Sequence, residues 1–254
     1  GDVRVGLTRA IEQCKHNLHA ESLQYDELLA SSSAAGGLKM CVHGLVYDMT
    51  VRAAKAAALG AGAVVRQTTA GKLTQSDMTE QRAIRPNLIL LAGGTDGGER
   101  ETALYNAELL AKHGTGAPVL YAGNAQNQSA MKTIFGNAGV PVYFAENVYP
   151  RLDVLNIEPV RKQIHAAFER HIVSAPGMEH IRDLVGGTIL PTPGAVMEAA
   201  MLLYEEIGDL LVLDIGGATT DVHSVTDGSE EIARLLSAPE RFCKRTGEGD
   251  LGLY

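Results

Sequence analysis

Short apolar runs alternate with helix-like patterns between residues 38 and 144, and this alternation constrains the fold more than any other feature. The run at 88–92 is continuously apolar, which is typical of a strand covered on both faces. Connections of the strand, helix, strand type are right-handed crossovers, so the alternation predicts a parallel sheet with its carboxyl ends along one edge. We predict strands at 38–46, 63–66, 88–92, 118–122 and 140–144, and helices at 49–59, 74–84, 99–112 and 128–137. The expected fold class is therefore α/β, with mostly parallel sheet layers and flanking helices.

The rhythm changes after Pro150, where we place a boundary between a domain of β-α repeats at 1–150 and a second region at 151–254. The second region begins with a long amphipathic pattern at 158–173, followed by an irregular stretch rich in Gly and Pro. Thr192 and Pro193 then suit the start of a helix that Gly208 ends. A buried strand is expected at 210–215. The second region is thus a helical connection that leads into a further lobe.

Charge and composition exclude several classes of function. The 254 residues hold 22 Lys and Arg against 30 Asp and Glu, a net charge of −8, which disfavours a nucleic-acid or anionic membrane surface. No apolar run approaches the ~20 residues that a membrane span needs. The chain begins without Met and shows no export signal, and its three separated cysteines have no disulfide or metal spacing, so we expect a cytoplasmic protein.

One segment carries the chemistry. A strand at 210–215 is followed by a glycine turn and a second strand at 222–225, which favours a hairpin over a P-loop or dinucleotide loop. Glycines let backbone amides approach phosphate oxygens, threonines add hydroxyl donors, and a strand-end carboxylate suits hydrated Mg²⁺. The alternative is a structural hairpin whose glycines only permit the turn. The predicted phosphate-binding residues are Asp214, Gly216, Gly217, Thr219, Thr220 and Asp221, with Asp214 holding magnesium through water.

Other polar segments are weaker candidates. The loop of Gly93, Gly94, Thr95 and Asp96 follows a strand and precedes a helix, so it suits either an anion or a tight connection. Glu248 and Asp250 could bind a metal, but a solvated acidic turn is the favoured interpretation. We also predict a loop at 31–33, a helix cap at Asp48, a helical pattern up to Glu27, and hydrogen-bonded structural roles for His43 and His223.

Four stretches of sequence resemble a known family. They are SSAAGGLKMCVHGLVYDMTVRAAKAAALGAGAVV at 32–65, LILLAGGTDGG at 88–98, LVLDIGGATTDVHSV at 211–225 and TGEGDLGL at 246–253. The third resembles the second phosphate hairpin of the superfamily that contains actin, hexokinase and the heat-shock chaperone ATPases. Together they resemble the glutamate mutase accessory family called MutL, which is unrelated to the mismatch-repair protein of that name.

This resemblance implies an actin-like (ribonuclease H-like) ATPase fold that uses ATP and Mg²⁺. In clostridial operons the family accompanies adenosylcobalamin-dependent mutases, and it resembles an ATP-driven reactivating chaperone for them. The partner would be such a mutase. Gly1 and Asp2 resemble the stretch just after the family's first phosphate hairpin, so the expectation is a fragment that holds a partial nucleotide-binding lobe at 151–254 and is inactive alone.

Two other functions stay open. A small-molecule kinase of the same superfamily would need an acceptor pocket, for which no motif is found. A flavodoxin-like module at 38–144 could bind a cofactor such as cobalamin directly, although Asp48 is followed by Met49, Thr50 and Val51, so the DxHxxG signature is absent. No nucleophile and base pair is visible, but phosphoryl transfer needs none. A homo-oligomer is also left open.

Overall fold

A five-stranded parallel sheet forms the centre of the computed structural model, with the strand order β3-β2-β4-β5-β6. Its strands are β2 (Lys39–Gly44), β3 (Val64–Ala70), β4 (Leu88–Leu91), β5 (Val119–Tyr121) and β6 (Val142–Phe144). The predicted α/β class with a parallel sheet is confirmed. The structure describes residues 3–24, 26, 28–32, 38–173, 185, 189–216, 219–235 and 242–249.

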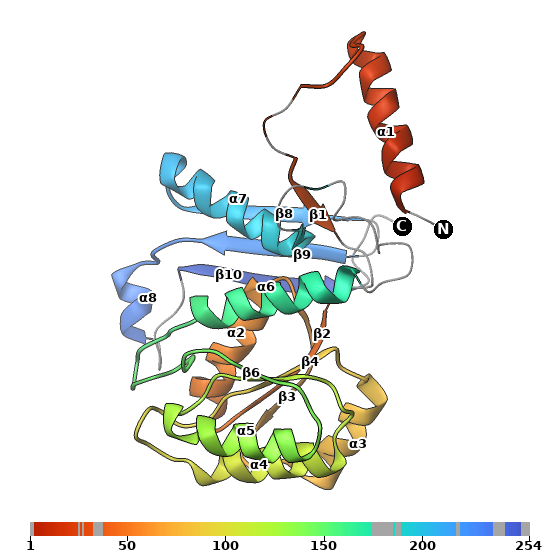
Figure 1. Cartoon of the computed structure of the whole chain (residues 1–254). Coiled ribbons are helices and arrows are strands. Elements are labelled where there is room, and N and C mark those ends of the chain that lie inside the picture. Colours follow the sequence, from red (N-terminus) through yellow and green to blue (C-terminus); the bar gives the residue numbers. More distant parts are fainter. Residues whose placement is uncertain are drawn as a thin grey trace.

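Helices cover both faces of this sheet (Figure 1). Leu88 and Leu90 of β4 join the buried cluster of α2 and α6, whereas Ile89 and Leu91 join the cluster of α4 and α5. This double burial explains the continuous apolar run. Among the described residues, no helix combines the length and apolarity of a membrane span. The helices are η2 (Tyr47–Val51, a π-helix), α2 (Arg52–Gly60), α3 (Gln75–Ile84), α4 (Glu101–His113), η3 (Ala125–Asn127), α5 (Gln128–Asn137) and α6 (Glu158–Val173).

A second, antiparallel sheet has the order β10-β9-β8 and lies beyond α2 and α6 in Figure 1. Helix α7 packs on it through a small cluster that includes Met197, Ala200 and Val225. The predicted boundary near residue 150 stays a prediction. The elements are β8 (Leu210–Ile215), β9 (Thr219–Val225), β10 (Cys243–Gly249), α7 (Thr192–Ile207) and α8 (Glu230–Leu235).

The prediction of a buried strand at 210–215 is wrong in one respect. Leu211, Leu213 and Ile215 are 63%, 56% and 51% exposed, whereas Leu210 and Val212 pack in the cluster under α7. Strand β8 lies at the edge of its sheet among the described residues, and alternate side chains of a strand point to opposite faces. An apolar run therefore does not distinguish one covered face from two.

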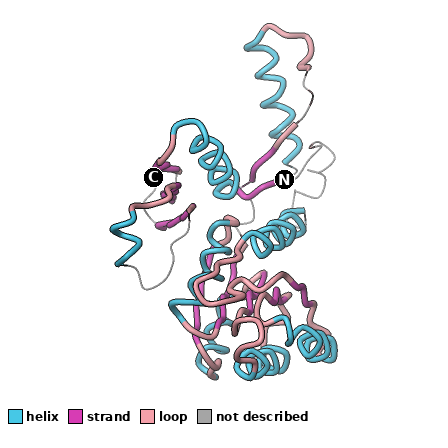
Figure 2. Tube along the Cα trace, turned by 90° about the vertical axis from the view of Figure 1, so that its left-hand side faces the viewer, coloured by secondary structure: helices cyan, strands magenta, loops and turns pink. Residues whose placement is uncertain are grey.

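The N-terminal region also departs from the prediction. Helix α1 (Val3–Leu18) ends well before Glu27 and projects away from the rest of the molecule (Figures 1 and 2). Ser31 and Ser32 lie in strand β1 (Ala30–Ser32), which pairs in parallel with β7 (Ile189–Pro191), so the predicted loop is wrong for these two residues. The partner strand is about 160 residues away, and no local pattern could have indicated it.

The predicted helix cap at Asp48 is wrong. The helix begins earlier, at Tyr47 in η2, with Val46 as its N-cap, so Asp48 lies inside the first turn. The hydroxyl of Thr50 accepts hydrogen bonds from the backbone N–H groups of Leu45 (2.9 Å) and Val46 (3.1 Å). Thr50 thus supplies the side-chain acceptor at the start of this helix.

Candidate functional site

Strands β8 and β9 form the hairpin that the sequence predicts. They pair antiparallel, with Asp214 opposite Asp221 and Ile215 opposite Thr220. Gly216 is exposed at the turn, whereas Gly217 lies outside the described residues. Strand β9 begins at Thr219, earlier than the predicted residue 222. Residues 216–218 therefore connect the two strands, and Gly216 is the one of them that the structure describes.

The Asp214 carboxylate differs from that of Asp221 in its surroundings. Its side chain is half-buried at the carboxyl end of β8, next to the exposed Gly216, and it has no hydrogen-bond partner among the described residues. Within the same part of the chain, no group of three or more His, Cys, Asp or Glu residues could hold a metal ion. Asp214 alone suits a hydrated Mg²⁺ ion, which takes one or two carboxylates and fills its other positions with water and phosphate oxygens.

Asp221 has a different environment. It is 6% exposed, and its Oδ1 accepts hydrogen bonds from Nη2 (2.8 Å) and Nε (3.2 Å) of Arg245 on β10. Taking a carboxylate out of water is costly unless it is paired in this way. The ion pair cancels the charge of Asp221, which therefore adds little repulsion against an anion at the turn.

Strand β10 changes the interpretation of the segment near the C-terminus. Glu248 pairs with Thr220 and Gly247 with Asp221, so Glu248 lies in a strand beside the hairpin and the predicted acidic turn is wrong for it. Asp250 lies outside the described residues. The segment carries too few apolar residues to show strand alternation, and its pairing with β9 supplies what the local sequence lacks.

The two strand histidines differ from each other. His43 is fully buried, and its ring contacts Thr69 Oγ1 (2.8 Å) and Gln81 Oε1 (3.1 Å), as predicted. Burial lowers the pKa of His43 to about 4. His223 on β9 is also buried, but neither ring nitrogen has a hydrogen-bond partner among the described residues, so its predicted role is wrong. Burial, and then the charge of Arg245, lower the pKa of His223.

The glycine loop after β4 is tied to its neighbours. Asp96 Oδ1 accepts hydrogen bonds from the backbone N–H of Ala125 (2.9 Å) and from Nδ2 of Asn147 (3.0 Å), which also donates to the carbonyl of Gly94 (3.0 Å). Gly94 has φ +48°, and a Cβ there would collide with the Glu99 carbonyl. These contacts join the loops that follow β4, β5 and β6, which accounts for Gly94 and Asp96 without a ligand.

The two predicted sites lie at opposite edges of the five-stranded sheet. Gly93 and Gly94 follow the carboxyl end of β4. Arg245, the partner of Asp221, donates to the carbonyls of Leu59 and Ala63, just before β3 begins, which is the amino edge of the same sheet. The structure therefore does not combine the glycine loop and the hairpin into one site.

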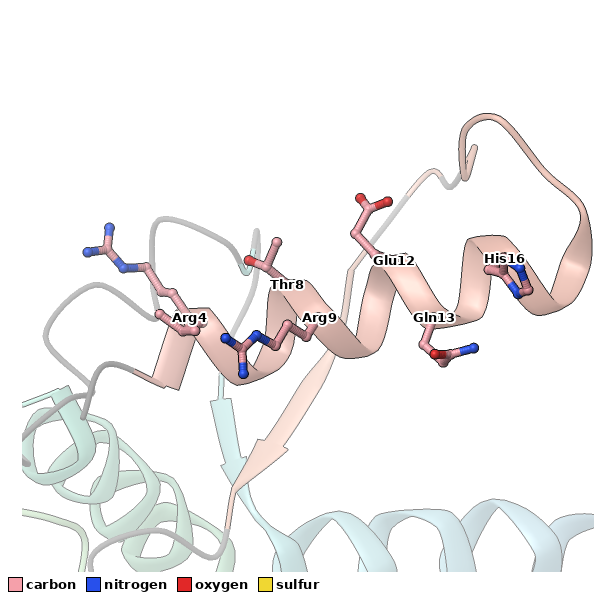
Figure 3. Close-up of a pocket in the computed structure, with 7 residues that line it drawn as sticks. Arg4, Thr8, Arg9, Glu12, Gln13 and His16 are labelled. Carbon is pink, nitrogen blue, oxygen red and sulfur yellow. The ribbon is translucent and has the colours of Figure 1, made fainter.

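An opening of about 950 Å³ lies along α1 (Figure 3). The described residues that line it all belong to this one helix, and the labelled side chains are spread along its length instead of converging on a point. Ligand sites are usually concave and have a few convergent polar groups. The lining residues are Arg4, Val5, Thr8, Arg9, Glu12, Gln13 and His16.

Arg245 is the residue at this site that sequence reasoning missed. It lies 24 positions from Asp221 and within a short polar strand, so neither spacing nor periodicity marks it. No local signal was available. Five of the seven residues of β9 are polar, so the sequence does not show that Asp221 faces the interior, where a carboxylate requires a cation.

Comparison with known proteins agrees with the resemblance found in the sequence. A family model described as MutL protein matches residues 1–254. Protein MutL of Clostridium tetanomorphum is 45% identical over 260 aligned residues, which cover 99% of this chain and 56% of that protein. The chain thus spans about half the length of the curated relative that it matches. On these matches, the chain belongs to the MutL family.

Proposed function

We propose that the hairpin from Asp214 to Asp221 holds the phosphates of ATP, within an accessory protein that reactivates an adenosylcobalamin-dependent mutase of the glutamate mutase type. The observation that carries the nucleotide part is the half-buried Asp214 carboxylate, which lies near the exposed Gly216 and has no hydrogen-bond partner among the described residues. Membership of the MutL family supports the proposal that the partner is a mutase, because the resemblance implies a glutamate mutase accessory role.

Asp214, Gly216 and Arg245 have distinct parts in this proposal. Asp214 holds a hydrated Mg²⁺ ion, and Gly216, which has no side chain, lets the backbone approach phosphate oxygens. Arg245 neutralises Asp221, so the hairpin presents one net negative group instead of two. Bound ATP would supply the phosphoanhydride whose hydrolysis releases free energy. Positioning and charge neutralisation are the main requirements of phosphoryl transfer, so no nucleophilic side chain is needed.

Magnesium should depend on the nucleotide. The described residues offer no cluster of three metal-ligating side chains, and Mg²⁺ loses its waters reluctantly. We therefore expect the ion to bind as Mg-ATP and to bind poorly without the phosphates. Calcium-type cages made of protein oxygens are not expected here.

The test is a melting experiment on the full-length protein with Mg-ATP. A ligand that binds only the folded state stabilises it by about 2.7 kcal/mol at a concentration of 100 Kd. Asp214→Asn should abolish the rise in Tm that Mg-ATP causes. Asp48 is an exposed carboxylate at the carboxyl edge of the five-stranded sheet, so Asp48→Asn should retain this rise. An unchanged shift in Asp214→Asn contradicts the assigned site. The absence of both stabilisation and hydrolysis, with or without the mutase, contradicts ATP dependence.

A second function has one observation in its favour. The strand order β3-β2-β4-β5-β6 reverses direction between β2 and β4, and open α/β sheets bind ligands at such a switch point. This order is the flavodoxin-like arrangement, so the five-stranded part could bind a cofactor such as cobalamin directly. Spectroscopic titration of the protein with cobalamin tests it, and a spectrum that does not change at saturating cobalamin excludes this function.

A further inference from the structure

Arg245 connects the hairpin to the C-terminal end of α2, a helix that packs on the five-stranded sheet. Besides its two bonds to Asp221, its Nη1 donates to the carbonyls of Leu59 (3.2 Å) and Ala63 (3.5 Å). Leu59 lies in the last turn of α2, where carbonyls lack partners within the helix and a positive charge is favourable. One guanidinium therefore bonds strand β9 and the C-terminus of α2 at the same time.

This connection is buried and has a fixed geometry. The side chains of Arg245 and Asp221 are only 7% and 9% exposed. A guanidinium is planar, and its donors form a rigid fork, so its bonds on one side fix the directions of those on the other. A lysine could neutralise Asp221 but could not reproduce the bonds to Asp221 and to both carbonyls.

The end of α2 is also enclosed on another side. Gly62 has φ +80°, and a Cβ there would lie 2.7 Å from Cγ of Pro191 and 3.2 Å from the backbone N of Gly194 in α7. Helix α2 also contacts β10 directly. Closely packed interiors transmit displacements instead of absorbing them. A shift of the hairpin therefore has to move α2 as well.

The N-terminal end of the helix formed by η2 and α2 lies at the switch point between β2 and β4. The five residues of η2 and the nine of α2 are continuous and extend together ~20 Å. At the carboxyl end of β2, a Cβ on Gly44 would lie 2.7 Å from Cγ2 of Val51, so η2 packs directly against the strand. Tyr47 and Val46 are 55% and 43% exposed there. π-Helical turns of this kind are frequent at functional sites.

We propose that Arg245 is a positioning residue that couples the phosphate hairpin to α2, so that nucleotide at the hairpin moves η2 at the opposite edge of the five-stranded sheet. This inference rests on the proposed function, since it requires nucleotide at Asp214 to Asp221. It adds a direction of communication: the exposed surface around Tyr47 responds to the nucleotide, although it does not bind it.

A single introduced tryptophan can report this movement. These 254 residues contain no Trp, so Tyr47→Trp places a single tryptophan within them, on η2, and the unsubstituted full-length protein gives the background emission. Tyr105→Trp is a matched control, because Tyr105 is 42% exposed on α4, on the face of the sheet that α2 does not cover. Mg-ATP added to the full-length protein should change the emission of Trp at 47 and leave that of Trp at 105 unchanged.

Arg245→Lys then tests the coupling. It keeps a cation beside Asp221, and the rise in Tm with Mg-ATP measures how much nucleotide the variant still binds. At Mg-ATP concentrations that saturate each protein, the response at position 47 should be much smaller in the variant. Circular dichroism confirms folding of the variant. Hydrogen exchange of residues 47–60 with and without Mg-ATP gives a second measurement that needs no variant, and we expect nucleotide to change it.

The outcomes separate the two proposals. If Mg-ATP binds but changes neither the emission at position 47 nor the exchange of residues 47–60, the coupling is wrong and the nucleotide site stands. A full response in Arg245→Lys shows that Arg245 is not the coupling residue. If Mg-ATP does not bind, the nucleotide site is wrong, and the coupling is rejected with it.

Discussion

Replacing Arg245 by Met gives the largest stability effect that we predict. The substitution keeps an apolar stem of similar length and removes the guanidinium, which leaves the carboxylate of Asp221 buried with no cation beside it. Breaking a buried ion pair by removing one partner costs about 3 to 5 kcal/mol. For a chain of this size each kcal/mol lowers Tm by about 2 to 4 °C, so we expect Tm to fall by roughly 6 to 20 °C.

Circular dichroism melting and urea titration measure this effect. Two further variants show whether it arises from the unpaired charge of Asp221. Asp221→Asn combined with Arg245→Met removes both charges, so it should recover most of the lost stability. Arg234→Met removes an ion pair to Glu230 whose side chains are 79% and 89% exposed, and it should cost less than about 1 kcal/mol. The reasoning is refuted if Arg245→Met costs no more than Arg234→Met, or if the double variant is as unstable as the two single losses added together.

Three further predictions concern the five-stranded part. Burial, with the charge of Glu80, raises the pKa of Cys41 to about 12, so a thiol-reactive disulfide reagent at pH 8 should modify the exposed Cys14 but not Cys41 until the protein unfolds. Burial lowers the pKa of His43 from 6.5 to about 4, so its ring stays neutral in the folded state at pH values where the unfolded chain binds a proton. The free energy of unfolding should therefore fall by about 3 kcal/mol between pH 6.5 and pH 4, as measured by urea titration at each pH. Thr74→Ala removes the capping box of α3 and should cost about 1 kcal/mol in urea titration.

Each of these predictions has a clear contrary result. Modification of Cys41 at the same rate as Cys14 would show that its strand opens readily. An NMR titration of the His43 ring with a midpoint near 6.5 would contradict its burial as a neutral group. Thr79→Ala serves as the control for Thr74→Ala, because Thr79 is exposed within the same helix, and an equal loss in both would show that the cap contributes nothing specific.

Local periodicity predicted the five-stranded sheet well. The run at 88–92 has both of its faces covered, by α2 and α6 on one side and by α4 and α5 on the other, so its sequence is apolar throughout. Helix α6 has the predicted bounds, Glu158–Val173, because its apolar stripe faces one large cluster. Where burial is extensive and nearby in the sequence, the pattern specifies the element.

Local periodicity failed to predict the strands that depend on pairing with distant parts of the sequence. Strand β10 has a polar sequence and is a strand because β9 pairs with it. Strand β1 depends in the same way on β7. At the hairpin, the residue types around Asp214 and Gly216 indicated two strands joined by a short connection, and β8 and β9 do pair antiparallel. Arg245 could not be identified, because a buried ion pair between residues 24 positions apart leaves no mark on either local sequence.

A crystal structure of the full-length protein with Mn²⁺ and a non-hydrolysable ATP analogue tests the central claim most directly. Mn²⁺ replaces Mg²⁺ and is located by its anomalous scattering. We expect the phosphates to lie against the turn at Gly216, with the Mn²⁺ peak beside the carboxylate of Asp214. Phosphates bound at the Gly93 to Asp96 loop, or a hairpin without nucleotide in crystals that hold it elsewhere, would contradict the account.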